Sequence, residues 1–213
     1  MDLTLIYTFL GFGLAAYSVI ANDSVQTLGT FIASNERFKW YWLATAASAV
    51  LTFTLIYGWV VNDGDITFGR LNKIPYQTIQ WYHAAAPFIL VALTRGGIPV
   101  STTFLVLSAF ASTVILEKVL IKSVVGYGLA ATVAYIVWIC VSYFINEKFD
   151  KVPENHRKAW VVAQWFTTGF LWYTWLSHDV ANIAVFLPRQ LSLEFLIMCI
   201  VTLSLLLFYI FWD

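Results

Sequence analysis

Apolar residues fill seven long blocks of this sequence, and none of these blocks contains a charged side chain. The blocks are 18 to 24 residues long and cover 3–22, 40–62, 74–94, 96–116, 123–146, 159–178 and 195–212. About 20 apolar residues allow an α-helix to cross the hydrocarbon core of a bilayer. The blocks are continuous rather than alternating, which favours helices over a β-barrel. We therefore predict an all-α, multi-pass integral membrane protein that forms a helical bundle.

The composition supports this prediction. Apolar residues make up 60% of the chain and charged residues only 11%, whereas about a quarter of the residues of a soluble domain are charged. Lys plus Arg and Asp plus Glu both total 12, so the chain lacks the basic surface of a nucleic-acid-binding protein. It has no GxxxxGK[ST], GxGxxG or CxxC motif, so we do not expect an enzyme, and an ion gradient or a partner must supply any energy.

The stretch 74–116 differs from the other blocks because proline, glycine and a charge interrupt it. Pro87 lies in its first half, Arg95 separates the halves, and two glycines open the second half. Short apolar segments broken in this way are typical of re-entrant hairpins in transporters. Two kinked full spans are the alternative, because Pro and Gly are common in membrane helices. Both interpretations return the chain to the same side of the membrane.

Basic residues in the connecting segments indicate the orientation. With the N-terminus outside the cell, six Lys and Arg residues lie on the cytoplasmic side and four lie outside. The positive-inside rule therefore favours a cell-membrane protein with its N-terminus outside. In this arrangement 147–158 is a cytoplasmic linker. It separates the first half with the hairpin, 1–146, from an incomplete second half, 159–213.

Two similar segments of the chain lie 156 residues apart. Tyr17 and Asp23 in the first copy correspond to Tyr173 and Asp179 in the second. Five predicted spans precede the second copy, so the two copies enter the membrane from opposite sides. Such an inverted-topology repeat is typical of secondary transporters. The helical run around each aspartate reaches roughly 30 residues, longer than the hydrocarbon core, so we expect each motif helix to be broken or strongly tilted there.

Asp23 and Asp179 are the only acidic residues deep in apolar surroundings. An unpaired carboxylate is costly at membrane depth, which makes both residues candidates for function. They could bind cations such as Na⁺, carry protons, or form a buried polar pair that only holds helices together. Two ionised aspartates close together repel each other, so a cation must lie between them or one must be protonated.

Three consecutive hydroxyls follow Pro99, on Ser101, Thr102 and Thr103. Proline fits the first turn of a helix, and the free N–H groups of a helix N-terminus attract anions. The hydroxyls could therefore help to bind an oxyanion. Alternatively, they could bond to their own helix or to a neighbouring span.

Together these motifs resemble the inorganic phosphate transporter (PiT) family of cation-coupled symporters. That family carries a G-A-N-D-V-A-N motif in both inverted halves, and the counterparts here are 21–26 and 177–182. The family's P-[VI]-S-T-T hairpin motif matches 99–103. Its Q-x-x-T ahead of the second motif matches Gln164 and Thr167. The motifs occur in family order and are spread across most of the chain.

The resemblance implies import of inorganic phosphate by alternating access, with Na⁺ or H⁺ as the coupling ion and no other cofactor. The implied phosphate-binding residues are Asp23, Ser101, Thr102, Thr103, Asp179 and Asn182. The implied cation-binding residues are Asn22, Asp23, Gln26, Gln164, Thr167, Asp179 and Asn182, with Na⁺ at the two aspartates. The implied partners are phosphate and the lipid bilayer, together with a homo-oligomer or a complementary chain.

The sequence departs from the family pattern at several positions. Gln26 and His178 replace asparagines of the two motifs, and Phe104 stands where the family usually has histidine. Val-Phe at 185–186 replaces Gly-Pro after the second motif. These changes could alter the coupling ion or the anion.

The second copy stops before the position of a second P-V-S-T-T hairpin, so we expect a fragment of a longer protein. A partner chain that supplies the hairpin and a reduced form of the fold are the alternatives. Three other functions stay open: a sulfate/H⁺ symporter of the same family, a non-transporting half-subunit, and an intramembrane aspartyl protease. The protease is disfavoured because the chain lacks the Tyr-Asp and Gly-x-Gly-Asp motifs of such enzymes.

Overall fold

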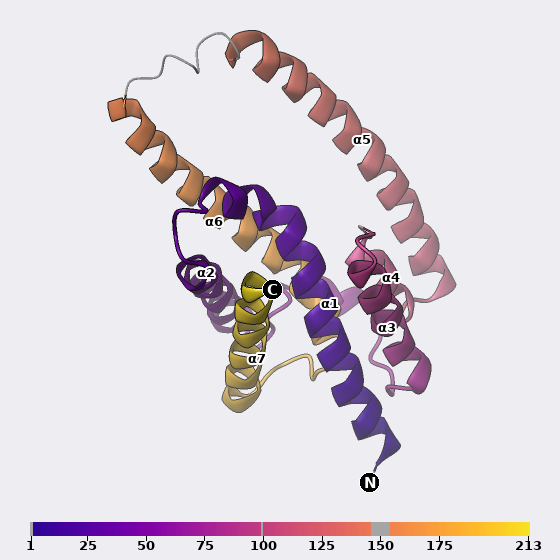
Figure 1. The fold of residues 1–213 in the computed structure, drawn as a ribbon. Helices are drawn as coiled ribbons and strands as arrows, with labels where there is room; N and C mark the ends of the chain where they lie inside the picture. Colours follow the sequence, from indigo (N-terminus) through magenta and orange to yellow (C-terminus); the bar gives the residue numbers. More distant parts are fainter. Residues whose placement is uncertain (1, 99, 146–153) are drawn as a thin grey trace. The chain divides into compact units, whose positions relative to one another are not determined.

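The computed structural model describes residues 2–98, 100–145 and 154–213. All regular structure in these residues is helical (Figure 1). The α-helices are α1 (Leu3–Ser34), α2 (Trp40–Val61), α3 (Trp81–Arg95), α4 (Thr102–Ser108), α5 (Thr113–Ile145), α6 (Glu154–Ala184) and α7 (Leu193–Trp212), and the short 3-10 helix η1 is Arg70–Lys73. The all-α prediction is confirmed for the described residues. Pro99 and 147–153 of the predicted linker lie outside them.

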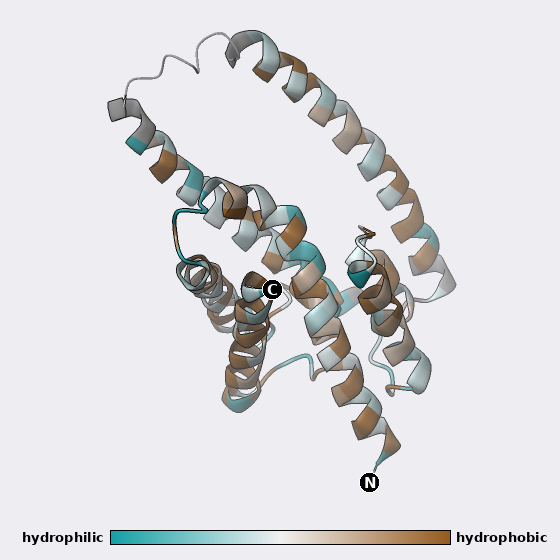
Figure 2. Ribbon diagram, viewed as in Figure 1, coloured by the Kyte–Doolittle hydropathy of each residue, from teal (hydrophilic) through white to brown (hydrophobic). Residues whose placement is uncertain are grey.

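Four helices of the described chain are long and apolar enough to cross a membrane, namely α1, α2, α7 and 116–143 of α5. They support the prediction of an integral membrane protein. Figure 2 shows that α7 is almost entirely hydrophobic, whereas hydrophilic residues interrupt α1. The helix α6 is not among the four. Its 31 residues are long enough, but polar side chains such as Gln164, His178 and Asp179 lower its hydropathy.

The interrupted stretch 74–116 contains two short helices. The helix α3 has 15 residues and α4 has 7, which correspond to about 22 Å and about 10 Å of helix. Neither reaches the roughly 30 Å of a hydrocarbon core. Gly97 ends α3 because its backbone takes a φ of +70°, a conformation that glycine adopts without steric cost.

Both helices that carry the motif aspartates are continuous, so the predicted break is wrong. The helix α1 runs without interruption through Asp23 over 32 residues, and α6 continues through Asp179. Sharp helix breaks generally require Pro, Gly or an inserted side chain, and 14–28 contains neither Pro nor Gly. The hydroxyls of Ser18 and Ser24 bond back to their own helix, at Leu14 O (2.7 Å) and Ala21 O (3.3 Å).

The described chain forms two compact units. One comprises 1–111 and 167–213, and the other comprises 112–166 with α5 and the first part of α6. The division at 147–158, which was predicted from the repeat, stays a prediction. In the first unit, α1 packs against α3 and α7, and α2 packs against α7. All residues discussed as a site below belong to this first unit.

The helices α2 and α7 run antiparallel. At the start of α2, the ring of Trp40 lies 6.2 Å from that of Phe208, near the end of α7. At the end of α2, Trp59 donates its indole N–H to Leu191 O, just before α7, at 2.8 Å. Two aromatic side chains thus fix both ends of this helix pair.

The helix α1 also runs antiparallel to the part of α6 in the same unit. A Cβ atom on Gly11 would come within 2.3 Å of the Phe186 ring, just beyond α6. Asp23, farther along α1, interacts with Asp179, which precedes Phe186. A later residue of α1 therefore meets an earlier residue of the α6 segment, and the predicted antiparallel direction is observed.

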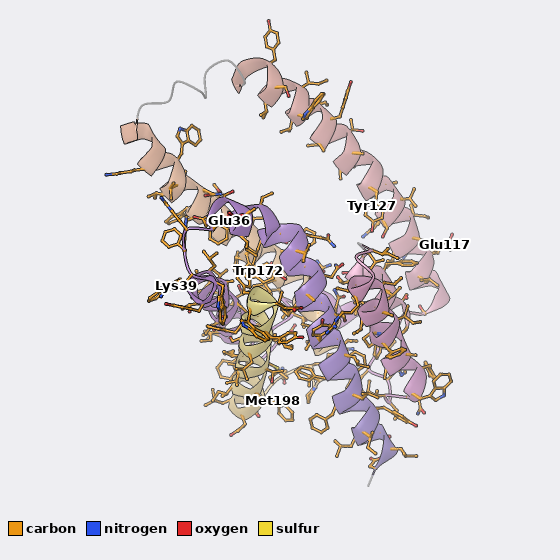
Figure 3. The ribbon with its side chains drawn as sticks, in the orientation of Figure 1. Glu36, Lys39, Glu117, Tyr127, Trp172 and Met198 are labelled. Carbon is orange, nitrogen blue, oxygen red and sulfur yellow. The ribbon has the colours of Figure 1, made fainter. Side chains whose placement is uncertain are left out.

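The interior of the first unit combines large side chains with small ones. Trp172 of α6, labelled in Figure 3, is fully buried. Its indole N–H donates to Ala47 O of α2 at 3.2 Å. Ala15 and Ala16 of α1 have no exposed surface. Small residues allow helix backbones to approach closely, which is the usual way in which helices associate in lipid.

Candidate functional site

Asp23 lies on α1 in a buried position, with 2% of its surface exposed. Asn22 donates its side-chain N–H groups to Asp23 Oδ1 at 3.1 Å and to the backbone Val100 O at 3.2 Å. The second bond connects α1 to the segment between α3 and α4, whose described residues (96–98, 100 and 101) we call the hairpin tip. Asn22 therefore places the hairpin tip beside the first motif aspartate.

Asp179 lies on α6 and receives two hydrogen bonds at Oδ1. Thr103 donates its hydroxyl at 3.0 Å, and Asn182 donates its amide at 3.2 Å. The same amide nitrogen lies 3.1 Å from Thr102 Oγ1 and 3.2 Å from Thr103 Oγ1. An amide carries only two protons, so these three acceptors share them. The start of α4 is thereby tied to the second motif aspartate.

The two aspartates interact with each other across the interface between α1 and α6. Two ionised carboxylates in a buried site repel strongly, because little water is present to screen them. Arg70 of η1 and the exposed His178 act electrostatically on Asp179. A cation between the carboxylates, or a proton on one of them, removes the repulsion.

Two buried polar atoms beside the carboxylates lack hydrogen-bond partners in the described part of the chain. They are Asn182 Oδ1 and the indole N–H of Trp175. The Trp175 N–H points to the Asp23 carboxylate but falls outside full hydrogen-bond geometry. A buried polar atom left without a partner costs about 1–3 kcal/mol. The free Asn182 oxygen is an acceptor that a bound cation can satisfy.

The acceptors of the site suit a hard cation. Asp23 and Asp179 supply carboxylate oxygens, and Val100 and Asn182 supply carbonyl oxygens. Hard cations prefer such oxygen ligands. In the part of the chain that the structure describes, no cluster of three or more His, Cys, Asp or Glu residues could hold a metal ion. Because the ligands here are carboxylate and carbonyl oxygens and not thiolates or imidazoles, the oxygen set fits an alkali cation or a proton better than a transition metal.

The structure brings together six of the predicted site residues. They are Asn22, Asp23, Thr102, Thr103, Asp179 and Asn182. Ser101 lies next to them, but its Oγ caps α4 by accepting the Phe104 N–H at 3.3 Å. Sequence reasoning missed the backbone carbonyl of Val100 and the indole of Trp175. Neither has a sequence signal, because a carbonyl is present at every residue and aromatic side chains are common throughout this chain.

Two other predicted residues of the first unit lie outside this group, and a third belongs to the other unit. Gln26 is exposed on α1, and its predicted role in cation binding stays a prediction. Thr167 is exposed and lies twelve residues before Asp179, which corresponds to about 18 Å of helix. Gln164 belongs to the other compact unit, and its predicted role stays a prediction.

The departures from the repeat motif occupy outward positions. Gln26 and His178 are exposed, whereas Asn22 and Asn182 are buried. Each motif therefore keeps its asparagine at the position that meets the site and loses it at the position that faces away. Phe186 is also buried, against Gly11.

In comparisons with known proteins, no family model, curated protein or solved structure matches this chain. The geometry of the site therefore carries the functional inference.

Proposed function

We propose that this protein is part or all of a secondary transporter that imports inorganic phosphate together with Na⁺ or H⁺ by alternating access. One observation carries the proposal. Two motif aspartates from antiparallel helices lie together in a buried place, where Thr103 donates to Asp179 and Asn182 donates to Thr102. A buried carboxylate pair is costly in a membrane protein, and such groups commonly mark ion pathways.

A second pair of contacts supports an inverted repeat. The offset of 156 that relates Asp23 to Asp179 also relates Tyr17 to Tyr173 and Phe53 to Tyr209. The rings of Tyr17 and Tyr209 lie 6.5 Å apart, and those of Tyr173 and Phe53 lie 5.9 Å apart. Position 17 of the first copy therefore packs against the counterpart of position 53 in the second copy, and position 53 of the first copy packs against the counterpart of position 17. This exchange is expected for two segments related by a two-fold axis.

The short helices α3 and α4 support a re-entrant hairpin. Asn22, which holds the hairpin tip through Val100 O, lies about 28 Å along an α1 that is roughly 48 Å long. The tip is therefore near the middle of a spanning helix, and the chain turns back there. A hairpin of this kind presents its tip to a site near the membrane centre.

Coupling follows from the charges in the site. A cation between Asp23 and Asp179 removes their repulsion and leaves the hydroxyls of Thr102 and Thr103 free to face an anion. Each ion then raises the affinity for the other, and linkage makes this effect reciprocal. A carboxylate can also accept the proton that phosphate keeps at pH 7. Sulfate has no such proton, so we favour phosphate over sulfate as the substrate.

Uptake into proteoliposomes tests this proposal. We expect radiolabelled phosphate to enter in a gradient of the coupling ion, Na⁺ or H⁺, but not in a matched K⁺ gradient, with excess sulfate failing to compete. Asp23→Asn and Asp179→Asn should each reduce uptake by at least about tenfold, the size expected for loss of a charged partner. Gln26→Ala is the matched control, because it alters the same motif at an exposed position.

The outcomes separate the alternatives. Normal uptake by Asp23→Asn with unchanged ion dependence means that the aspartates are only a structural pair. Uptake of sulfate in a proton gradient identifies the sulfate symporter. No uptake by the wild-type chain, with binding of neither ion, supports the non-transporting subunit.

A further inference from the structure

Arg95, the last residue of α3, makes contacts that the repeat motifs do not explain. Its Nε donates to the Tyr17 hydroxyl at 2.6 Å, and its guanidinium carbon lies 5.2 Å from the centre of the Tyr17 ring. Tyr209 of α7 lies beside Tyr17 and interacts electrostatically with Arg95. One side chain thus joins the end of α3 to α1 and α7.

The residues directly after Arg95 are bonded to the end of α3 through their backbone N–H groups, with Gly96, Gly97 and Ile98 donating to Ala92 O, Thr94 O and Leu93 O at 3.0 Å each, so the position of this segment follows that of the α3 end to which Arg95 belongs. Gly96 and Gly97 follow, and Gly97 has a φ of +70° with no atom within 4 Å of a Cβ built on it. Glycine is the most flexible residue, so its neighbours must fix its position. A few residues later the chain reaches Val100 O and then Thr102 at the candidate site. Arg95 is therefore the last side-chain attachment before the hairpin tip.

The repeat provides an internal comparison. Tyr173, the counterpart of Tyr17, packs against Phe53 and Tyr57, with ring centroids 5.9 Å and 6.5 Å away. The cation–π contacts among the described residues involve Arg37, Lys39 and Arg95, and none involves Tyr173. Among the described residues, Tyr17 contacts an arginine and Tyr173 has no cation–π contact, although both tyrosines pack against aromatic rings.

We propose that Arg95 is a positioning residue. By holding the hairpin tip against Tyr17 and Tyr209, it sets Thr102 and Thr103 at the distances at which they bond to Asn182 and Asp179. This inference rests on the proposed function, since the threonines matter for transport only if they line the substrate site. The attachment itself is a structural property that can be measured without transport.

The test compares two matched variants. Tyr17→Phe removes the hydroxyl that receives the Arg95 bond and keeps the ring, and Tyr173→Phe makes the same change at the repeat counterpart. Arg95→Lys keeps the charge but loses the planar guanidinium, so we expect its nitroxide distance distribution and its KM for phosphate to lie between those of the wild type and those of Arg95→Ala. Each variant is first checked for wild-type thermal unfolding.

Two readouts are taken from these variants. Pulsed electron paramagnetic resonance measures the distance between nitroxides at Ile98→Cys and Val25→Cys, two exposed positions, in a Cys140→Ser background. We expect Tyr17→Phe to lose the single narrow distance of the parent and Tyr173→Phe to keep it. Phosphate uptake should show a KM about tenfold higher in Tyr17→Phe, with a smaller change in kcat, since a bond to a charged group is lost.

The results distinguish the two proposals. If Tyr17→Phe and Tyr173→Phe behave alike in both readouts, Arg95 does not position the hairpin and this inference is wrong. If Tyr17→Phe alone broadens the distance while wild-type protein carries no phosphate, the attachment stands and the proposed function fails. If the distance stays narrow in Arg95→Ala, the hairpin tip is held by other contacts and the inference is again overturned.

Discussion

Asn182 shows how much of the site depends on one side chain. Its amide nitrogen lies within 3.2 Å of Asp179, Thr102 and Thr103, and its own oxygen has no partner among the described residues. Gln26, at the corresponding position of the first copy, is exposed. The same place in the repeat motif is therefore a site residue in one copy and a surface residue in the other.

This contrast leads to a prediction for Asn182→Ala. The change leaves the buried Thr102 hydroxyl without its donor, which costs about 1–3 kcal/mol and should lower phosphate uptake by about tenfold or more. Gln26→Asn, which restores the family residue, should leave uptake within about twofold of wild type because exposed substitutions have small effects. Uptake rates normalised to reconstituted protein provide the measurement. Equal changes in phosphate uptake for the two variants would show that the burial of Asn182 and the exposure of Gln26 do not determine their importance for transport.

A second prediction concerns Gly11 of α1. A Cβ atom there would meet the Phe186 ring at 2.3 Å, whereas nothing lies within 4 Å of a Cβ on Gly13. Overpacking of this kind typically costs about 1–3 kcal/mol. We therefore expect Gly11→Ala to lower the thermal unfolding temperature in detergent, and Gly13→Ala to leave it unchanged or raise it. Adding Phe186→Leu to Gly11→Ala should restore part of the lost unfolding temperature. If it restores none, the contact with Phe186 is not the cause of the destabilisation.

At the scale of the helices and their connecting segments, individual hydrogen bonds hold together parts of the chain that are distant in sequence. The segment after α2 and the segment before α7 meet through Leu191. Its N–H donates to Gly64 O at 2.9 Å, and its carbonyl accepts the indole N–H of Trp59 at 2.8 Å. Arg189 adds a bond to Ile74 O at 3.1 Å. These bonds join two connecting segments that lie far apart in the sequence.

Trp59→Phe tests this connection. The change removes the indole donor and leaves the Leu191 carbonyl with one bond fewer, so we expect a loss of about 1 kcal/mol in unfolding free energy. Trp42→Phe is the control, because Trp42 is 59% exposed at the start of the same helix. Thermal unfolding in one detergent compares the two variants. A larger effect at Trp42 would contradict the assignment of these bonds as structural.

At the scale of the whole molecule, the two aspartates connect ligand binding to stability. A cation that binds the folded site but not the unfolded chain stabilises the protein, by about 2.7 kcal/mol at a hundredfold excess over its Kd. When both are ionised and no cation is bound, Asp23 and Asp179 repel each other across α1 and α6. The proposed function therefore predicts that ion binding strengthens the contact between the two motif helices.

We expect Na⁺ to raise the unfolding temperature of the wild-type protein relative to K⁺, and phosphate to raise it further only when Na⁺ is present. Asp23→Asn should lose the Na⁺ effect, because it removes one carboxylate ligand and the repulsion together. A scan of unfolding temperature against salt at constant ionic strength makes the comparison. A Na⁺ shift of equal size in Asp23→Asn would place the cation at another site.

The sequence by itself determined the helical class, most helix positions, and several of the residues that meet in the candidate site. Continuous apolar blocks predict helices because lipid leaves no partner for an unpaired backbone group, and isolated carboxylates in apolar surroundings stand out by their cost. Asp23 and Asp179 were identified in this way, and Asn182 was identified from the motif around Asp179. Local pattern is sufficient for these features, since each depends on the residue and its neighbours in the chain.

Only the tertiary structure decided which of the motif residues meet. The repeat motif treats Gln26 and Asn182 alike, but packing buries one and exposes the other. The motif helices were expected to break or to tilt strongly; α1 does not break, because no residue near Asp23 interrupts its backbone bonds, and the tilt stays a prediction. The bond from Arg95 to Tyr17 joins residues 78 apart. Such contacts depend on how the helices approach one another, which is set by the sum of many side-chain contacts and not by any local pattern.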